Sequence, residues 1–296
     1  MEEKLKAFEE RRLKVCKKAN TLLLVAILCI VVGVGLLMLT GYPISFLFVL
    51  VAVILIMVSS SMKSKLSKQF KNEFIIQLVK DTYPNGVYNP GCGIDLEEML
   101  TAGFFKRPDL YKVEDYLAAE YDNVPFEMCD FDFKEKHVRR DSNGNTRITY
   151  ETYAKGRYMI FDFKREFSQV VKIVENAYLG LNKNGLEKVE TESIDFNKKF
   201  KIYSSDSLTA FYVLTPQVQL KILELESKFK GSLFLAYMKG KLYVAIVDGV
   251  SILDVNASKK VSLETLKMLE SQLLVPASII NELGLSSTKF TTGDAI

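Results

Sequence analysis

Two long runs of apolar residues stand near the beginning of the chain, with only three residues between them. The runs cover residues 21–40 and 44–58, and neither holds an Asp, Glu, Lys, Arg or His. A helix needs about 20 apolar residues to cross the hydrocarbon core of a bilayer, so the first run is long enough, and the flanking residues 59–62 extend the second. Because the connection at residues 41–43 is so short, the two helices must run antiparallel. The pattern predicts a two-helix transmembrane hairpin over residues 21–62.

Positive charge flanks the predicted hairpin on both sides, whereas its loop carries none. Residues 1–20 hold seven Lys or Arg, and residues 63–80 hold five Lys. Lys and Arg close to the ends of a span are typical of the cytoplasmic side of a membrane. We therefore expect a multi-pass protein of the cell membrane with its N-terminus and its C-terminal domain in the cytoplasm. A signal peptide is disfavoured, because the run is too long and a second span follows at once.

The hairpin is interpreted as an anchor rather than as a pore. Ion and substrate pathways need polar or ionisable groups at membrane depth, and the two runs are almost wholly aliphatic. The exceptions are Thr21, Cys29, Gly33, Gly35, Thr40 and Ser45. The two glycines would let a neighbouring helix approach closely, so association of the chain with itself or with a partner membrane protein stays open.

Outside the hairpin, the pattern divides the chain into three parts. Residues 1–20 place acids early and bases late, which suits the dipole of a short cytoplasmic helix. Residues 63–83 carry apolar residues at helical spacing and predict a juxtamembrane helix, which ends at a Pro-Asn-Gly breaker cluster. Residues 84–296 are long enough for a soluble domain with its own core, which we expect in the cytoplasm.

Helical and strand patterns occur in separate blocks within residues 84–296. A loop at 84–93 and helices at 96–100 and 113–119 are expected first. From residue 124 the apolar positions alternate as in a strand, and an Asn-Gly turn at 143–144 predicts a hairpin. Two further strands are expected within 146–163, with a bend near residues 155–156. Shorter strands are expected at residues 170–174, 186–191 and 200–203.

The C-terminal part of the chain holds stronger local signals. Asp206 or Ser207 is expected to cap a helix that reaches Leu214, and Thr215-Pro216 to begin the next helix, which runs to about residue 229. Two strands at residues 232–238 and 241–247 predict a β-hairpin, and helices near 262–274 and 276–283 close the chain. Because helices and strands come in blocks instead of strict alternation, the fold class is mixed α+β with an antiparallel sheet.

Composition excludes several classes of function. The net charge of +3 is too close to neutral to suggest a nucleic-acid partner. Four cysteines lie far apart and there is a single histidine, so the usual Cys/His zinc sites are excluded. We expect neither a bound metal nor a cofactor.

Several segments resemble the bacterial DUF3137 family. The most specific is residues 188–214, followed by Thr215-Pro216; the segment at 153–163, YAKGRYMIFDF, is also similar to the family. The resemblance covers most of residues 70–285. It implies a pair of membrane helices followed by an α+β domain of unknown function in a bacterial inner membrane, and it supplies no catalytic residues. Residues 208–211 are less charged than is common in the family at this helix.

Four groups of residues are candidates for chemistry, and each has a plainer structural interpretation. Residues 141–152 resemble a calcium loop, but Thr146 and Thr152 occupy the positions that need glycine and a bidentate acid, so a hairpin turn is favoured. Cys92 lies between two glycines and would need a base to act as a nucleophile; His137 is the only histidine that could serve.

The other two groups are carboxylates and hydroxyls. Asp130, Asp132 and Asp162 lie on predicted neighbouring strands, where converging carboxylates perform acid–base work, although such residues usually line a solvated face. The three residues Ser204, Ser205 and Asp206 precede a helix, where hydroxyls and free N–H groups bind anions, although capping is the more frequent role.

These observations favour a membrane-anchored cytoplasmic domain that binds a partner protein or a small ligand, in an interaction or regulatory role. An enzyme at the membrane face, working through the carboxylates or Cys92, is the alternative. A subunit of a transport assembly is a weaker one.

Overall fold

The computed structural model describes residues 2–40, 45–140, 144–163, 169–175, 181–253 and 258–291. Two compact units make up the chain. The first holds residues 1–78 and 253–270, and the second holds residues 79–252 and 271–296. The predicted loop at residues 41–43 lies outside the described residues, as do residues 141–143, which begin the candidate calcium loop and include the first residue of the predicted Asn-Gly turn.

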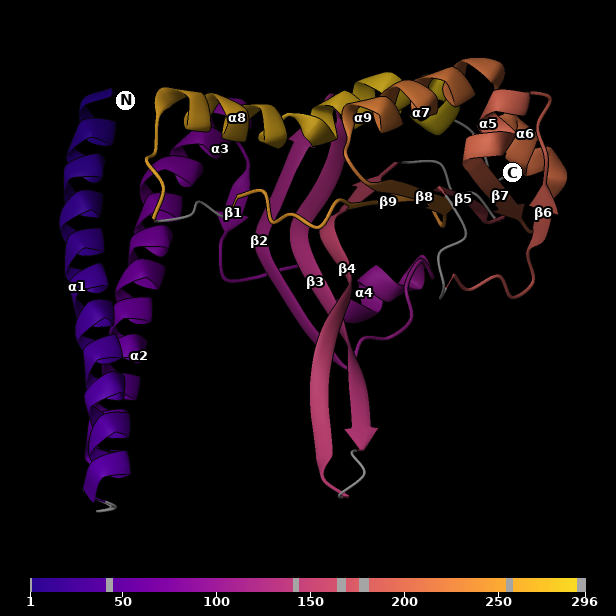
Figure 1. The fold of residues 1–296 in the computed structure, drawn as a ribbon. Helices are drawn as coiled ribbons and strands as arrows, with labels where there is room; N and C mark the ends of the chain where they lie inside the picture. The colour runs from indigo at the N-terminus through magenta and orange to yellow at the C-terminus, as the bar shows by residue number, and fades with distance from the viewer. Residues whose placement is uncertain are drawn as a thin grey trace. The chain divides into compact units, whose positions relative to one another are not determined.

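Two long helices dominate the first unit and run side by side (Figure 1). The first, α1, spans Glu2–Thr40, and α2 spans Ser45–Phe70. A π-helical turn, η1 (Lys71–Ile75), leads from α2 into α3 (Ile76–Thr82), and α8 (Leu263–Leu273) lies mostly in this unit. By length and composition both long helices are able to cross a membrane, as the apolar runs predict. Residues 2–20 form the first half of α1 and continue without a break into its apolar second half.

Small side chains recur every seven residues where α1 and α2 meet. Ala19, Ala26 and Gly33 are buried on α1, and Ala52 and Ser59 are buried on α2. The Ser59 hydroxyl donates a hydrogen bond of 2.9 Å to the carbonyl of Ala19. A seven-residue repeat of small residues brings two helix backbones close together, as in membrane helix pairs. The leucines, isoleucines and valines between these positions point outward and are exposed, as lipid-facing residues would be.

The charged end of α1 packs against the other elements of the first unit. Phe8 lies edge-on to Phe70 and Phe74, with ring centroids 5.5 Å apart in both pairs. Arg11 forms two hydrogen bonds to Glu73, of 2.9 and 2.7 Å. These contacts bury Phe8, which is 2% exposed.

The second unit is built on a nine-stranded sheet among the described residues, with order β1-β2-β3-β4-β9-β8-β5-β7-β6. All of its recorded pairings are antiparallel. The strands are β1 (Val87–Asn89), β2 (Leu110–Tyr121), β3 (Val124–Arg140), β4 (Thr146–Asp162), β5 (Val171–Glu175), β6 (Glu187–Val189), β7 (Phe200–Ser204), β8 (Ser232–Met238) and β9 (Lys241–Val247). The helices of this unit are α4 (Leu96–Thr101), α5 (Ile194–Lys199), α6 (Ser207–Val213), α7 (Pro216–Lys228), α9 (Val275–Leu283) and α10 (Thr288–Thr291). The predicted α+β class with an antiparallel sheet is confirmed.

Helices cover both faces of the sheet (Figure 1). On one face, α4 packs over an aromatic core that includes Phe104, Phe131 and Tyr158, and the Tyr158 hydroxyl donates to the carbonyl of Met99 in α4. On the other face, α9 lies against β3. There, Phe290 of α10 stacks on Tyr237 of β8. Each face thus excludes water from one set of alternating side chains.

Three sequence predictions differ from the structure. Residues 113–119 are not a helix but part of β2. A β-bulge between Glu114 and Leu117 interrupts the alternation, so Val113 and Leu117 stand four apart as they would in a helix. Within residues 146–163, one strand, β4 (Thr146–Asp162), replaces the two that were expected. The irregularity is a bulge near Tyr153, where the register shifts opposite Phe133 and Lys134, and not a bend at residues 155–156. Part of the expected loop at 84–93 is the short strand β1.

Candidate functional site

Three helices of the second unit, α5, α6 and α7, each begin at a residue whose side chain caps the helix. Ser193 accepts a hydrogen bond from the N–H of Phe196 at the start of α5. Asp206 accepts one of 2.8 Å from the N–H of Thr209 in α6, and Thr215 caps α7, with Pro216 in its first turn. Each cap satisfies an N–H that the helix cannot pair internally. The predicted starts at Asp206 and at Thr215-Pro216 are confirmed.

These helices border a groove with a volume of about 690 Å³. Its walls come from the connection between β6 and α5 and from helices α6 and α7. The lining residues are Glu190, Thr191, Glu192, Ser193, Phe211, Leu214, Pro216, Gln219, Leu220 and Leu223. A groove of this size is within the range of roughly 300–1,000 Å³ that is usual for ligand sites.

Large apolar side chains at the groove are exposed to solvent. Leu220 of α7 is 61% exposed and Phe211 of α6 is 47% exposed. Leu208 lies one turn before Phe211 on α6 and is also exposed, as is Ile194, which follows the groove residue Ser193. Apolar side chains that gather at a groove, rather than standing singly, mark a binding surface.

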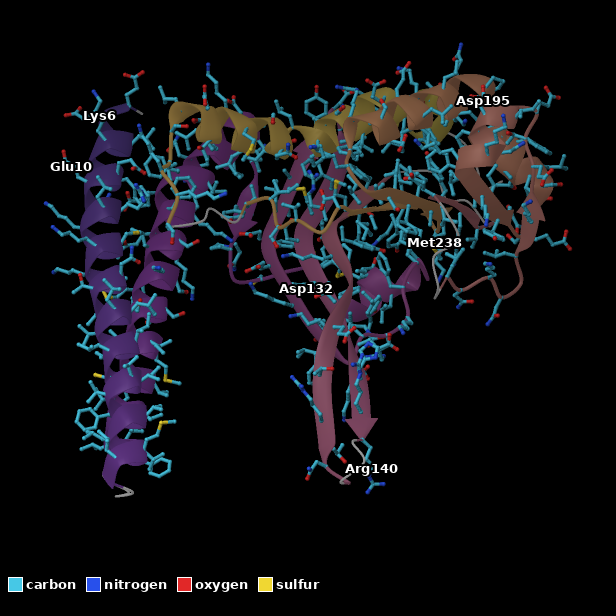
Figure 2. The ribbon with its side chains drawn as sticks, in the orientation of Figure 1. Lys6, Glu10, Asp132, Arg140, Asp195 and Met238 are labelled. Atoms are coloured by element: carbon cyan, nitrogen blue, oxygen red, sulfur yellow. The ribbon has the colours of Figure 1, made fainter. Side chains whose placement is uncertain are left out.

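The rim of the groove is acidic. Glu190 and Glu192 line it, and Asp195 lies nearby in the first turn of α5 (Figure 2). Lys188 lies 2.6 Å from Glu190, and this hydrogen bond lowers the pKa of Glu190. Lys198 lies 3.8 Å from Asp195. With three carboxylates against two lysines, the rim has a negative formal charge and favours a basic partner.

The Ser204–Asp206 segment uses its polar groups internally. Ser204 is buried, and its hydroxyl lies 2.9 and 2.7 Å from the carbonyl oxygens of Val170 and Asp206, one of which accepts its proton, while it accepts a hydrogen bond from the N–H of Asp206. The Ser205 hydroxyl donates to Gln169 at 2.6 Å and accepts from the N–H of Val170. The Asp206 carboxylate caps α6, and hydrogen bonds from Thr209 lower its pKa.

A second pocket, lined in part by this segment, does not favour binding of an anion. Its lining includes Glu187 and Glu190 together with Asp206, and Lys188 is the basic residue among its lining residues. The geometry supports the capping interpretation of these residues.

Asp130, Asp132 and Asp162 are not brought together. Asp130 and Asp132 lie on one face of β3, where Asp130 pairs across the sheet with Arg157. Asp162 lies five residues beyond Arg157 on β4, and an odd separation along a strand places side chains on opposite faces. On that opposite face Asp162 is 3.9 Å from Lys241, and burial raises its pKa.

Asp130 belongs to a buried polar cluster around Arg157, which the sequence did not single out. The Arg157 Nη1 donates to Gln272 at 3.0 Å, and its Nη2 is 3.6 Å from Asp248. Asp130 accepts a hydrogen bond of 2.8 Å from the N–H of Ile252. Burial lowers the pKa of Arg157, and the charges of Asp248 and Asp130 oppose that shift. The expectation of a solvated face is thus wrong for Asp130, which is 4% exposed.

The sole histidine does not lie near Cys92. Cys92 is exposed in the turn after β1, and its carbonyl accepts a hydrogen bond from Tyr116 beside the β2 bulge, close to Asp130 on β3. His137 pairs with Thr149 farther along β3, and its Nε2 is 3.7 Å from Glu151. Seven residues of strand separate Asp130 from His137, which is roughly 20 Å. The two side chains cannot act as a nucleophile and base in this arrangement.

Lys172 is a second titratable group that the sequence did not reveal. It lies on β5, is 6% exposed, and donates a hydrogen bond of 2.9 Å to the carbonyl of Asn182. Burial lowers its pKa to about 8. No cluster of three or more metal-ligating side chains occurs among the residues that the structure describes.

Comparison with known proteins finds a family model that matches part of the chain. Residues 152–285 match DUF3137, a family described as a protein of unknown function, which confirms the resemblance over that segment. The chain matches no curated protein. Among solved structures it is similar to the mycobacterial trehalose monomycolate transport factor A, TtfA, with 11% sequence identity over 67% of this chain and 92% of that one. The TM-score is 0.34, too low to support a conclusion about fold or function.

Proposed function

We propose that this chain, whose residues 152–285 match the DUF3137 family, is a membrane-anchored interaction protein. The helices α1 and α2 act as a two-span anchor in a bacterial inner membrane, with the N-terminus and the second unit in the cytoplasm. The second unit binds a segment of a partner membrane protein in the groove between α6, α7 and the β6–α5 connection.

The observation that carries this proposal is the exposed apolar lining of the groove. Leu220 and Phe211 present large hydrophobic surfaces to water, and each Å² of apolar area removed from water contributes roughly 25 cal/mol. Leu208 and Ile194 extend this surface beyond the groove itself. A partner that covers all four side chains gains more than a small molecule that fills only the groove.

The charge of the rim specifies the kind of segment that binds. Glu190, Glu192 and Asp195 place carboxylates around apolar side chains. A segment with apolar residues on one side and Lys or Arg beside them matches both features, as amphipathic helices do in the grooves of their receptors. Basic flanks of this kind are common where membrane proteins leave the cytoplasmic side of a bilayer.

Site-specific photo-crosslinking in cells tests the groove. A photoreactive amino acid at Leu220 is compared with one at Val87, an equally exposed position on the edge strand β1, where the two side chains are 61% and 62% exposed. We expect an adduct from position 220 only, and we expect mass spectrometry to map it to an apolar segment with basic residues. Equal adducts at both positions, or an acidic mapped segment, would refute the proposal.

A binding measurement then separates a specific contact from incidental capture. A synthetic peptide with the mapped sequence is titrated into the full chain in detergent. We expect Leu220→Asp to weaken binding at least tenfold, because a carboxylate replaces an apolar contact in an acidic groove, whereas Val87→Asp leaves binding unchanged. Both positions are exposed, so neither substitution threatens folding. Fusion of a compartment-specific reporter to the C-terminus checks the predicted cytoplasmic location.

A further inference from the structure

A two-stranded arm projects from the sheet of the second unit (Figure 1). It consists of residues 134–140 of β3 and residues 146–152 of β4, which pair from Lys134↔Thr152 to Arg140↔Thr146. Each strand of the arm is roughly 20 Å long at about 3.4 Å per residue. Arg140 lies at its far end (Figure 2).

Among the described residues, the arm has no neighbouring strand on either side. The last pair that β2 makes with β3 joins Leu110 to Lys134, and β9 pairs with β4 only from Arg157 onward. The bulge near Tyr153 lies at the base of the arm, and such bulges bend a strand and increase its twist. An isolated two-stranded ribbon gains little stability from its own packing. Because the arm extends beyond the rest of the sheet, we looked for a function that it could serve.

The two faces of the arm differ in charge. Paired residues of an antiparallel ribbon share a face, so Lys136 and Tyr150, Val138 and Ile148, and Arg140 and Thr146 form one face together with Lys134 and Thr152. This face, called here the basic–apolar face, holds no acidic residue. Glu135 and Glu151 lie on the other face, where Glu135 is 2.5 Å from Lys106 and Glu151 is near His137.

The basic–apolar face is open to solvent. Its three apolar side chains, Val138, Ile148 and Tyr150, are 59%, 50% and 47% exposed. Lys136 and Arg140 have no ion-pair partner within the described part of the chain, whereas Lys134 is 3.5 Å from Asp132 at the base. Cations without an ion-pair partner among the described residues thus alternate with exposed apolar groups along the outer part of the arm.

We propose that this arm docks its basic–apolar face onto an anionic lipid surface. Lys and Arg are attracted to the negative surface of the cytoplasmic leaflet, while aliphatic side chains and the tyrosine ring enter the boundary between headgroups and acyl chains. The same chain carries two helices able to span a membrane, so a bilayer is always within tethered reach, which raises its effective concentration at the arm. An acidic protein would match the cations but not the membrane-interface chemistry of the tyrosine and aliphatic side chains.

The contact depends on membrane insertion of the spans but not on the groove. Its failure is therefore distinguishable from failure of the proposed function. Flotation of the reconstituted protein with vesicles reports span insertion regardless of what the arm does, and crosslinking at Leu220 reports the groove.

A fluorescent label on the arm tests the proposal in the full chain. Cys16, Cys29 and Cys92 are replaced by Ser, while Cys129 is completely buried and stays. A polarity-sensitive dye is attached to Thr146→Cys on the basic–apolar face or, as a control, to Thr149→Cys on the other face. The protein is reconstituted into vesicles of phosphatidylcholine alone or with roughly 30% phosphatidylglycerol, with a quencher attached to the lipid acyl chains.

We expect quenching at position 146 that exceeds quenching at position 149, requires phosphatidylglycerol, and weakens when salt is raised from about 0.1 M to 1 M, which shortens the Debye length from roughly 10 Å to 3 Å. Lys136→Gln with Arg140→Gln lowers the ratio of docked to free arm about 25-fold, taking about 1 kcal/mol per cation and 1.4 kcal/mol per factor of ten. Arg139→Gln with Arg147→Gln removes the same charge from the other face and changes this ratio less than about fivefold.

Three outcomes would overturn the proposal. The first is equal quenching at positions 146 and 149, and the second is quenching that is the same without anionic lipid. The third is an arm that stays unquenched in vesicles but that a photoreactive amino acid at Ile148 crosslinks to an acidic protein in cells, which would assign the arm to that protein instead.

Discussion

Arg157→Leu should destabilise the second unit strongly, because it leaves buried carboxylates without their counter-charge. The Arg157 side chain is 3% exposed and that of Asp248 is 12% exposed. Asp130, its cross-strand neighbour, is 4% exposed. The leucine also removes the hydrogen bond that joins Arg157 to Gln272.

The size of the effect follows from the burial of these groups. Breaking a buried ion pair from one side costs about 3–5 kcal/mol. Part of this cost is offset, since the Nε of Arg157 is buried without a hydrogen-bond partner, and removing such a group gains roughly 1 kcal/mol or more. We therefore expect a loss near the lower end, about 3 kcal/mol. Arg157→Leu with Asp248→Leu should recover only part of it: replacing both charges of a buried pair by apolar groups is often neutral, but Asp130 stays buried beside them without a counter-charge.

Urea unfolding of the full chain in detergent measures this loss. Tyr42 is the only one of the 14 tyrosines that precedes residue 79, and the chain has no Trp, so the near-ultraviolet circular dichroism of tyrosine follows the second unit. Arg107→Leu is the matched control, because Arg107 pairs with Glu97 where the side chains are 62% and 67% exposed, and exposed pairs contribute about 0–1 kcal/mol. If Arg157→Leu costs no more than this control, the cluster is effectively solvated and the reasoning is wrong.

Three further variants test other parts of the fold by the same assay. The pKa of Lys172 is about 8 in the folded chain, whereas its ordinary value is 10.5. Between these pH values the unfolded chain binds more protons, so the free energy of unfolding should rise with pH by up to about 3 kcal/mol. Lys172→Met should abolish this pH dependence. Asp95 caps α4 by accepting from two N–H groups, so Asp95→Ala should cost about 1 kcal/mol, whereas Asp95→Asn, also a good cap, should cost little. A Cβ at Gly156 would lie 1.9 Å from the carbonyl oxygen of Ile246. Gly156→Ala should therefore cost about 2–3 kcal/mol of stability by forcing the strands apart. Gly91→Ala is the control and should be neutral, because the nearest atom to its Cβ, the Oδ1 of Asn89, would be 3.7 Å away.

Local chemistry explains the features that could be predicted from the sequence. A cap such as Asp206, or Thr215 followed by proline, acts on N–H groups within three residues of itself, so its effect does not depend on the rest of the fold. The hairpin at residues 232–247 was predicted with its observed strand bounds. Its turn residues Lys239 and Gly240 both have positive φ, 50° and 70°, which a two-residue turn of this kind requires.

The errors arise where a strand departs from regular alternation. The bulge in β2 places Val113 and Leu117 at helical spacing, and Asp115 adopts a φ of 61° there. This residue is buried and accepts a hydrogen bond from the Tyr88 hydroxyl, which comes from a neighbouring strand. Because that contact joins residues 27 positions apart in sequence, it cannot be predicted from a local sequence pattern.

The candidate sites show the same division. The types of residue in the groove and in the arm are visible in the sequence, but their grouping is not. The groove joins the β6–α5 connection to two helices that follow it. The basic–apolar face of the arm exists only because the register pairs Lys136 with Tyr150 and Val138 with Ile148; a shift of one residue would mix acids into it.

The sequence by itself determined that two apolar helices begin this chain and that capped helices and an antiparallel hairpin follow. Hydrophobic length and short-range hydrogen bonding are properties of contiguous residues, so they can be predicted without a fold. Only the tertiary structure decided that Asp130 lies in a buried cluster with Arg157, that Asp162 faces the other way, and that one face of the arm carries no acid. These facts depend on strand register and on which helix covers which face, and both are set by packing between segments that are distant in the chain.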